Sequence, residues 1–148
     1  MPQQETIERL TYLCNTLPHL MKQIPEADFS HKPAPGKWSK KEILGHLIDS
    51  ATNNHQCFIR IQFEHEPCIF YDQNNWNLFS HYNKLDSSHV INFWGLYNRH
   101  LLEIIKRIPE VYLSLNSITS NDERVTLGFL IDDYVVHMEH HLQQIVKY

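Results

Sequence analysis

The residues best suited to chemistry lie near the end of the chain, where His137, His140 and His141 fall in an apolar-periodic segment. An α-helix turns by about 100° per residue, so His137 and His141 lie one turn apart on one face. On the same wheel these two histidines face the apolar stripe, whereas His140 points away from it. Two imidazoles so placed can hold one metal ion. The competing interpretation is that they are partly buried or surface histidines held by hydrogen bonds.

A third histidine, His46, occupies a similar position on another predicted helix. Ser39 and Glu42 have the spacing of a capping box, which predicts a helix that starts just after Trp38. His46 borders the apolar stripe of that helix, as His137 does on the last one. Asp49 follows one turn later, where it could orient a histidine or simply contact water. Three neutral imidazoles with one open position are typical of catalytic zinc.

Other known site patterns do not match the chain. In the zincin pattern HExxH a glutamate follows the first histidine, and here Met138 follows His137. A di-iron bundle needs a glutamate three residues before each ligand histidine, yet Tyr134 and Met138 occupy those positions. The sequence has no GxGxxG, phosphate-loop or GxSxG pattern, so nucleotide binding and serine hydrolysis have no support.

Composition indicates an ordinary soluble domain. The chain has 148 residues, of which 42% are hydrophobic and 20% are charged, and we expect residues 1–148 to form a single domain. A net charge of -4 without a basic cluster argues against a nucleic-acid partner. There is no apolar run long enough for a membrane span or a signal core, so we expect no membrane association and a cytoplasmic location. Three cysteines without CxxC spacing favour reduced thiols.

Hydrophobic periodicity predicts four helices and therefore an all-α four-helix bundle. The first helix repeats apolar residues from Ile7 to Ile24, and Pro18 is expected to kink or break it near residues 15–17. A third helix follows Asp86, and a fourth follows Thr126 after a polar loop over residues 114–123. No strand pattern is evident. The long crossing over residues 64–84 is rich in aromatic residues, and we interpret it as a flap over one end of the bundle, with Tyr71 and Trp76 as candidates for a substrate pocket.

An ordered set of short motifs resembles the DinB superfamily, in particular its YfiT-like branch. The resemblance covers nearly the whole chain, and it is carried by Trp38-Ser39, Glu42, Gly45 to Ser50, Asp72-Gln73 with Trp76, Asp132 to His137, and His141 to Ile145. Members of that family are four-helix bundles, often dimeric, that bind a divalent metal, commonly nickel or zinc. One histidine of the second helix and two of the last are the ligands. The resemblance therefore implies His46, His137 and His141 as metal ligands and suggests a homodimer.

The resemblance is less specific about the activity than about the metal ligands. YfiT-like members are described as metal-dependent hydrolases, and characterised relatives transfer low-molecular-weight thiols or isomerise maleylpyruvate. The chain is then expected to act on a small molecule, with a metal-bound water or thiol as nucleophile. The sequence identifies no general acid or base. Asp49 and Asp133 are candidates only for orienting the histidines. The simpler interpretation is that each is a solvated charge on a helix surface.

The alternative is a non-catalytic metal-binding or stress-associated bundle. In that case the metal clamps two helices together, and a fourth protein ligand closes the site. The histidines that could close it are His55, His100 and His140.

Overall fold

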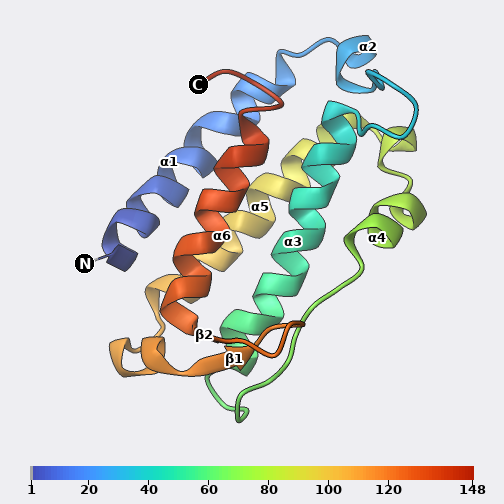
Figure 1. The fold of residues 1–148 in the computed structure, drawn as a ribbon. Helices are drawn as coiled ribbons and strands as arrows, with labels where there is room; N and C mark the ends of the chain where they lie inside the picture. The colour runs from blue at the N-terminus through green and yellow to red at the C-terminus, as the bar shows by residue number, and fades with distance from the viewer. Residues whose placement is uncertain (1) are drawn as a thin grey trace.

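The computed structural model describes residues 2–148, and its four long helices pack side by side (Figure 1). They are α1 (Pro2–Lys22), α3 (Lys40–Arg60), α5 (Ser87–Lys106) and α6 (Leu127–Leu142). Short elements connect them: α2 (Glu26–Phe29), α4 (Gln73–Ser80), the 3₁₀ helices η1 (Tyr82–Lys84) and η2 (Glu110–Ser114), and the strands β1 (Asn116–Ile118) and β2 (Arg124–Thr126). The all-α four-helix bundle predicted from the sequence is confirmed.

The long helices form a ring in which α1 contacts α5, α5 contacts α3, α3 contacts α6, and α6 contacts α1. This arrangement makes α3 and α6 direct neighbours although the crossing segment and α5 separate them in the sequence. Their inward side chains fill one core, which includes Leu10, Leu17, Leu47, Phe58, Trp94, Leu101, Ile131 and Met138. Within the described residues, no helix is long and apolar enough to cross a membrane.

Local capping sets the start of three of these helices. The Ser39 hydroxyl accepts a hydrogen bond from the Glu42 amide, and the Glu42 carboxylate accepts one from the Ser39 amide, which completes the predicted capping box. Asp86 caps α5 and Thr126 caps α6 in the same way, each through an amide three residues on. The register of α3 and α6, and with it the direction of their histidines, is therefore fixed close to each helix start.

Pro18 does not break the first helix, which runs from Pro2 to Lys22, so of the predicted kink or break near residues 15–17 the break is wrong. The ring of Pro18 removes the amide that would bond the Cys14 carbonyl. Arg99 of α5 replaces it: its Nη2 donates to the Cys14 carbonyl at 3.0 Å, and its Nη1 donates to Asn15 Oδ1 at 3.1 Å. Helix α1 runs through the proline because a neighbouring helix supplies the missing donor.

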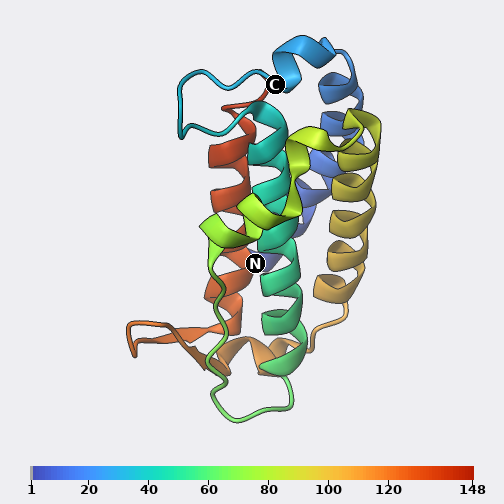
Figure 2. The same cartoon turned by 90° about the vertical axis from the view of Figure 1, so that its right-hand side faces the viewer.

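The crossing segment follows the flank of α3 rather than covering an end of the bundle, which corrects the interpretation as an end flap (Figure 2). Tyr82 of η1 packs so closely on Gly45 of α3 that an added Cβ at Gly45 would lie 2.1 Å from the Tyr82 ring. Tyr82 is buried, whereas Phe70 and Phe79 remain exposed. The crossing segment thus covers a part of α3, near Asp49, where the sequence had allowed contact with water.

A short antiparallel hairpin replaces the polar loop predicted over residues 114–123. Asn116 pairs with Thr126 and Ile118 with Arg124, and Ile118 also bridges to Cys68 of the crossing segment. Asp122 has a φ of 60° in the turn. Strands of three residues are too short for an alternating pattern, which explains why no strand could be predicted here.

Candidate metal centre

The structure brings His46, His137 and His141 together between α3 and α6. One ligand nitrogen from each lies within 4.8 Å of the other two. The ring centroids are separated by 5.5 Å for His46 and His137, 4.8 Å for His46 and His141, and 4.7 Å for His137 and His141. In the part of the chain that the structure describes, these residues form the one group of three potential ligands within such reach.

Burial and neighbouring imidazoles lower the pKa of His46 and of His137 and so favour their neutral forms. His46 is 2% exposed, and burial together with the neighbouring His141 and His137 rings lowers its pKa to about 4. Burial and His141 also lower the pKa of His137, although the nearby Asp133 carboxylate acts in the opposite direction. Neutral imidazole is the form that binds a metal, so the charge state and the spacing of the cluster both fit a divalent ion.

Hydrogen bonds occupy the Nδ1 atoms of two of the histidines. The Tyr71 hydroxyl lies 3.4 Å from Nδ1 of His46, and Gln144 Oε1 lies 3.1 Å from Nδ1 of His141. The Trp38 ring packs against His46 with centroids 5.1 Å apart. Contacts of this kind orient a ligand histidine and leave its Nε2 available. The spacing of Gln144 three residues after His141 could have indicated its contact, whereas nothing in the sequence pointed to Tyr71 as a partner of His46.

The two carboxylates proposed to orient histidines do not hydrogen bond to the cluster. Asp133 is exposed and acts on His137 only through space. Asp49 is 3% exposed, so its interpretation as a solvated helix charge is wrong. Tyr82 donates to its Oδ1 at 2.5 Å, and its Oδ2 has no hydrogen-bond partner among the residues that the structure describes. Tyr82 covers this face of α3 because η1 folds back on it, which a helical wheel cannot reveal.

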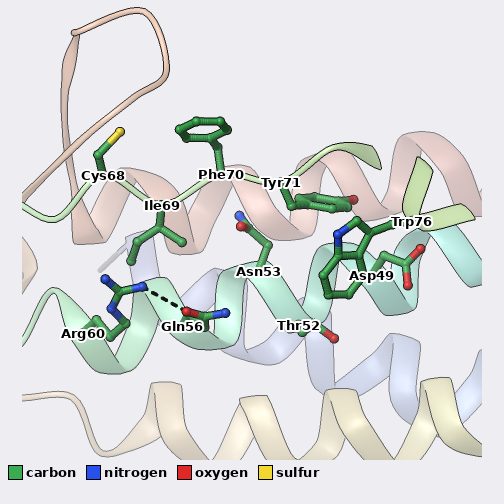
Figure 3. Close-up of a pocket in the computed structure, with 10 residues that line it drawn as sticks. All are labelled: Asp49, Thr52, Asn53, Gln56, Arg60, Cys68, Ile69, Phe70, Tyr71 and Trp76. Carbon is green, nitrogen blue, oxygen red and sulfur yellow. Dashed lines mark hydrogen bonds between the residues drawn. The ribbon is translucent and has the colours of Figure 1, made fainter. Parts of the chain in front are cut away.

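A pocket of about 260 Å³ lies between α3 and the segment that leads into α4 (Figure 3). Both candidate pocket residues line it, and the rings of Tyr71 and Trp76 meet edge to face with centroids 5.6 Å apart. The remaining lining residues are Asp49, Thr52, Asn53, Gln56, Arg60, Cys68, Ile69 and Phe70. Tyr71 connects the pocket to the histidines, since its hydroxyl contacts His46.

The other histidines considered as ligands lie outside this group. His140 is exposed, as the wheel predicted. His55 and His100 pair with each other at a ring separation of 5.5 Å, and Nδ1 of His55 lies 2.9 Å from the Tyr97 hydroxyl. Among the described residues, none of the three joins the cluster of His46, His137 and His141.

The sequence profile of the DinB superfamily matches residues 9–145. The chain belongs to the DinB superfamily. No curated protein is significantly similar to it in sequence.

Solved structures of the superfamily share the fold. YfiT from Bacillus subtilis, described as a probable metal-dependent hydrolase with an unusual four-helix bundle topology, is similar with a TM-score of 0.87 and 19% identity, over 97% of this chain and 83% of YfiT. A mutant of the mycothiol-dependent maleylpyruvate isomerase is similar with a TM-score of 0.80 and 11% identity, over 100% of this chain and 62% of that enzyme. A second structure of the isomerase has a TM-score of 0.79 at 13% identity, over 98% of this chain and 61% of the enzyme.

Proposed function

We propose that this DinB-superfamily protein is a metal-dependent enzyme of the YfiT-like type, with His46, His137 and His141 as its metal ligands. One observation carries the proposal: three imidazoles from two helices have ligand atoms within 4.8 Å of one another, and the described residues add no fourth histidine, cysteine or carboxylate to the group. An incomplete protein ligand set is the arrangement of catalytic sites, because structural zinc sites are usually closed by a fourth protein ligand.

A divalent ion held by these residues would supply Lewis acidity, lowering the pKa of a water or low-molecular-weight thiol so that it can attack an electrophile near neutral pH. We propose zinc or nickel, both of which imidazole ligands suit. The surrounding residues have supporting roles. Tyr71 and Gln144 would orient His46 and His141, and Trp38 would shield the His46 ring from water.

The pocket that Tyr71 connects to the histidines supports a small-molecule substrate. Its volume of about 260 Å³ suits a compound of modest size, and Tyr71 and Trp76 would contact it. The reaction is hydrolysis or thiol transfer. The solved relatives include an enzyme named for its dependence on mycothiol, which makes a low-molecular-weight thiol a reasonable first substrate to test. The homodimer and the cytoplasmic location stay predictions.

The test is metal content measured by mass spectrometry on untagged protein. We expect roughly one zinc or nickel ion per chain in the wild type and in His140→Ala, whose altered side chain is exposed, and almost none in His46→Ala. Thiols and electrophiles are then assayed on the same samples. A wild type that carries no metal and takes none up on titration would refute the proposal. Full loading without turnover, and without an exchangeable water on the ion, would favour the non-catalytic clamp instead.

A further inference from the structure

Asp49, one of the residues that line the pocket, has a buried acceptor oxygen that no group among residues 2–148 satisfies. Asp49 lines the pocket and is 3% exposed. Its Oδ1 accepts from the Tyr82 hydroxyl at 2.5 Å, and within the described part of the chain its Oδ2 has no hydrogen-bond donor. A buried carboxylate oxygen without a hydrogen bond destabilises the folded state, so such an atom needs an explanation.

The other polar side chains of the pocket do not supply the missing donor. Arg60 is the one cation among the lining residues, and it lies 11 positions from Asp49 on α3, about 16 Å along the helix axis (Figure 3). Its guanidinium is already engaged, with Nε 2.6 Å from Glu64 Oε2 and Nη1 2.9 Å from Gln56 Oε1. The Thr52 hydroxyl donates to the carbonyl of Ile48 at 3.3 Å.

Asp49 is also well placed relative to the histidines. It follows His46 by three residues on α3, and residues at this spacing are neighbours on a helix surface. Tyr71 connects the two positions: its hydroxyl lies 3.4 Å from His46 Nδ1, and its ring lines the same pocket as Asp49. A small molecule in this pocket would therefore lie against Asp49 and against a residue, Tyr71, that contacts His46.

We propose that the pocket binds a substrate carrying an N–H or O–H donor, an amine, amide or hydroxyl group, which hydrogen bonds to Oδ2 of Asp49 and so selects donor-bearing substrates. This inference rests on the proposed function, because it assigns the pocket to the substrate of the same site. Trp76 and Tyr71 enclose the bound molecule from the side opposite α3. Asp49 is then a specificity-determining residue of the pocket.

The test compares three thiols of one shape, cysteamine, mercaptoethanol and propanethiol, which end in an ammonium, a hydroxyl and a methyl group. Each is titrated into the protein under reducing, oxygen-free conditions, and binding is followed by the NMR signal of the Trp76 indole. We expect the two donor-bearing thiols to bind about tenfold more tightly than propanethiol. The ammonium and hydroxyl arms separate a charge effect from a hydrogen bond, since both carry donors and only one is charged.

Two variants assign the preference to the pocket. Asp49→Asn keeps an oxygen for the Tyr82 hydroxyl and replaces the unpartnered oxygen by an amide NH₂, which cannot accept from an ammonium, so the preference for cysteamine over propanethiol should fall below about twofold. Asp133→Asn makes the same charge change beside His137 but outside the pocket, and should keep the full preference.

The wild-type series alone can overturn the inference, even if Asp49→Asn fails to fold. Equal binding of all three thiols would mean that a water molecule or a rotated Asn53 amide, and not the substrate, donates a hydrogen bond to Oδ2 of Asp49. Metal content measured on the same samples separates this result from failure of the proposed function. A donor preference without metal uptake would contradict the enzyme and keep the pocket assignment. Metal uptake without a donor preference would support the metal site and contradict the pocket assignment.

Discussion

His46 is the candidate ligand whose protonation would most directly interfere with metal binding. Its pKa is lowered from 6.5 to about 4 by burial and by the two neighbouring imidazoles. Between those two pH values the His46 imidazole is protonated in the unfolded chain and neutral in the folded chain. The stability of the metal-free protein should therefore fall as the pH drops from about 6.5 to about 4.

The corresponding prediction concerns His46→Gln, measured by urea unfolding with a chelator present. Acidification from about pH 7 to about pH 4.5 should cost the wild type up to roughly 3 kcal/mol more than the variant, because only the wild type must keep the imidazole of His46 neutral. An equal loss in both proteins would contradict the lowered pKa of His46.

Asp49 should have the opposite pH dependence. Burial raises its pKa from 3.8 to about 6, although the Tyr82 hydrogen bond acts against the rise. The folded state therefore binds the proton more tightly, and the ionised carboxylate destabilises the protein above about pH 6. We predict that Asp49→Asn raises the free energy of unfolding by about 1–3 kcal/mol near pH 8 and changes it little near pH 4.

Chemical unfolding of the metal-free proteins at both pH values checks this prediction. Asp133→Asn is the control, because its carboxylate is exposed and its removal should leave stability within about 0.5 kcal/mol of the wild type. A destabilised Asp49→Asn variant at high pH would mean that the carboxylate contributes to folding. A gain in stability would instead indicate a residue retained for binding at a cost to the fold.

At the scale of the elements, α1 depends on α5 at one point. Arg99 donates to the Cys14 carbonyl, which Pro18 leaves without its helical partner. We predict that Arg99→Ala costs about 1 kcal/mol in the wild type and less than half of that in a Pro18→Ala background, where the restored amide at position 18 satisfies the carbonyl. A double-mutant cycle by thermal or urea unfolding measures the coupling. Equal costs in both backgrounds would show that Arg99 acts through other contacts.

The elements also show where sequence reasoning works and where it stops. Three helix starts could be predicted because capping depends on a few adjacent residues, here those at Ser39, Asp86 and Thr126. Periodicity on two such helices was enough to select His46, His137 and His141. The burial of Asp49 was missed because Tyr82 reaches it from a segment some thirty residues away, and the contact between Tyr71 and His46 was missed for the same reason. Local patterns set helix faces, whereas the path of the crossing segment is decided by tertiary packing.

At the scale of the molecule, the candidate site joins two helices that the fold makes neighbours. His46 comes from α3, while His137 and His141 come from the last two turns of α6, just before the chain leaves the bundle. Apolar packing already holds the two helices together, because the core around Leu47 and Met138 is continuous between them. The bundle is therefore expected to fold without metal, and an ion bound by the cluster would add stability without creating the fold.

This expectation gives the last prediction, which uses His141→Ala. An ion present at about a hundred times its dissociation constant stabilises the folded state by roughly 2.7 kcal/mol. Zinc or nickel should therefore raise the melting temperature of the wild type by several degrees, and a chelator should remove the gain. In His141→Ala the helicity should change little and the metal-dependent gain should disappear, because two histidines remain of three. Circular dichroism melts of both proteins, with and without metal, measure the effect. If His141→Ala kept the full gain, the ion would bind elsewhere, and the link between the histidine cluster and the stability of the bundle would have to be abandoned.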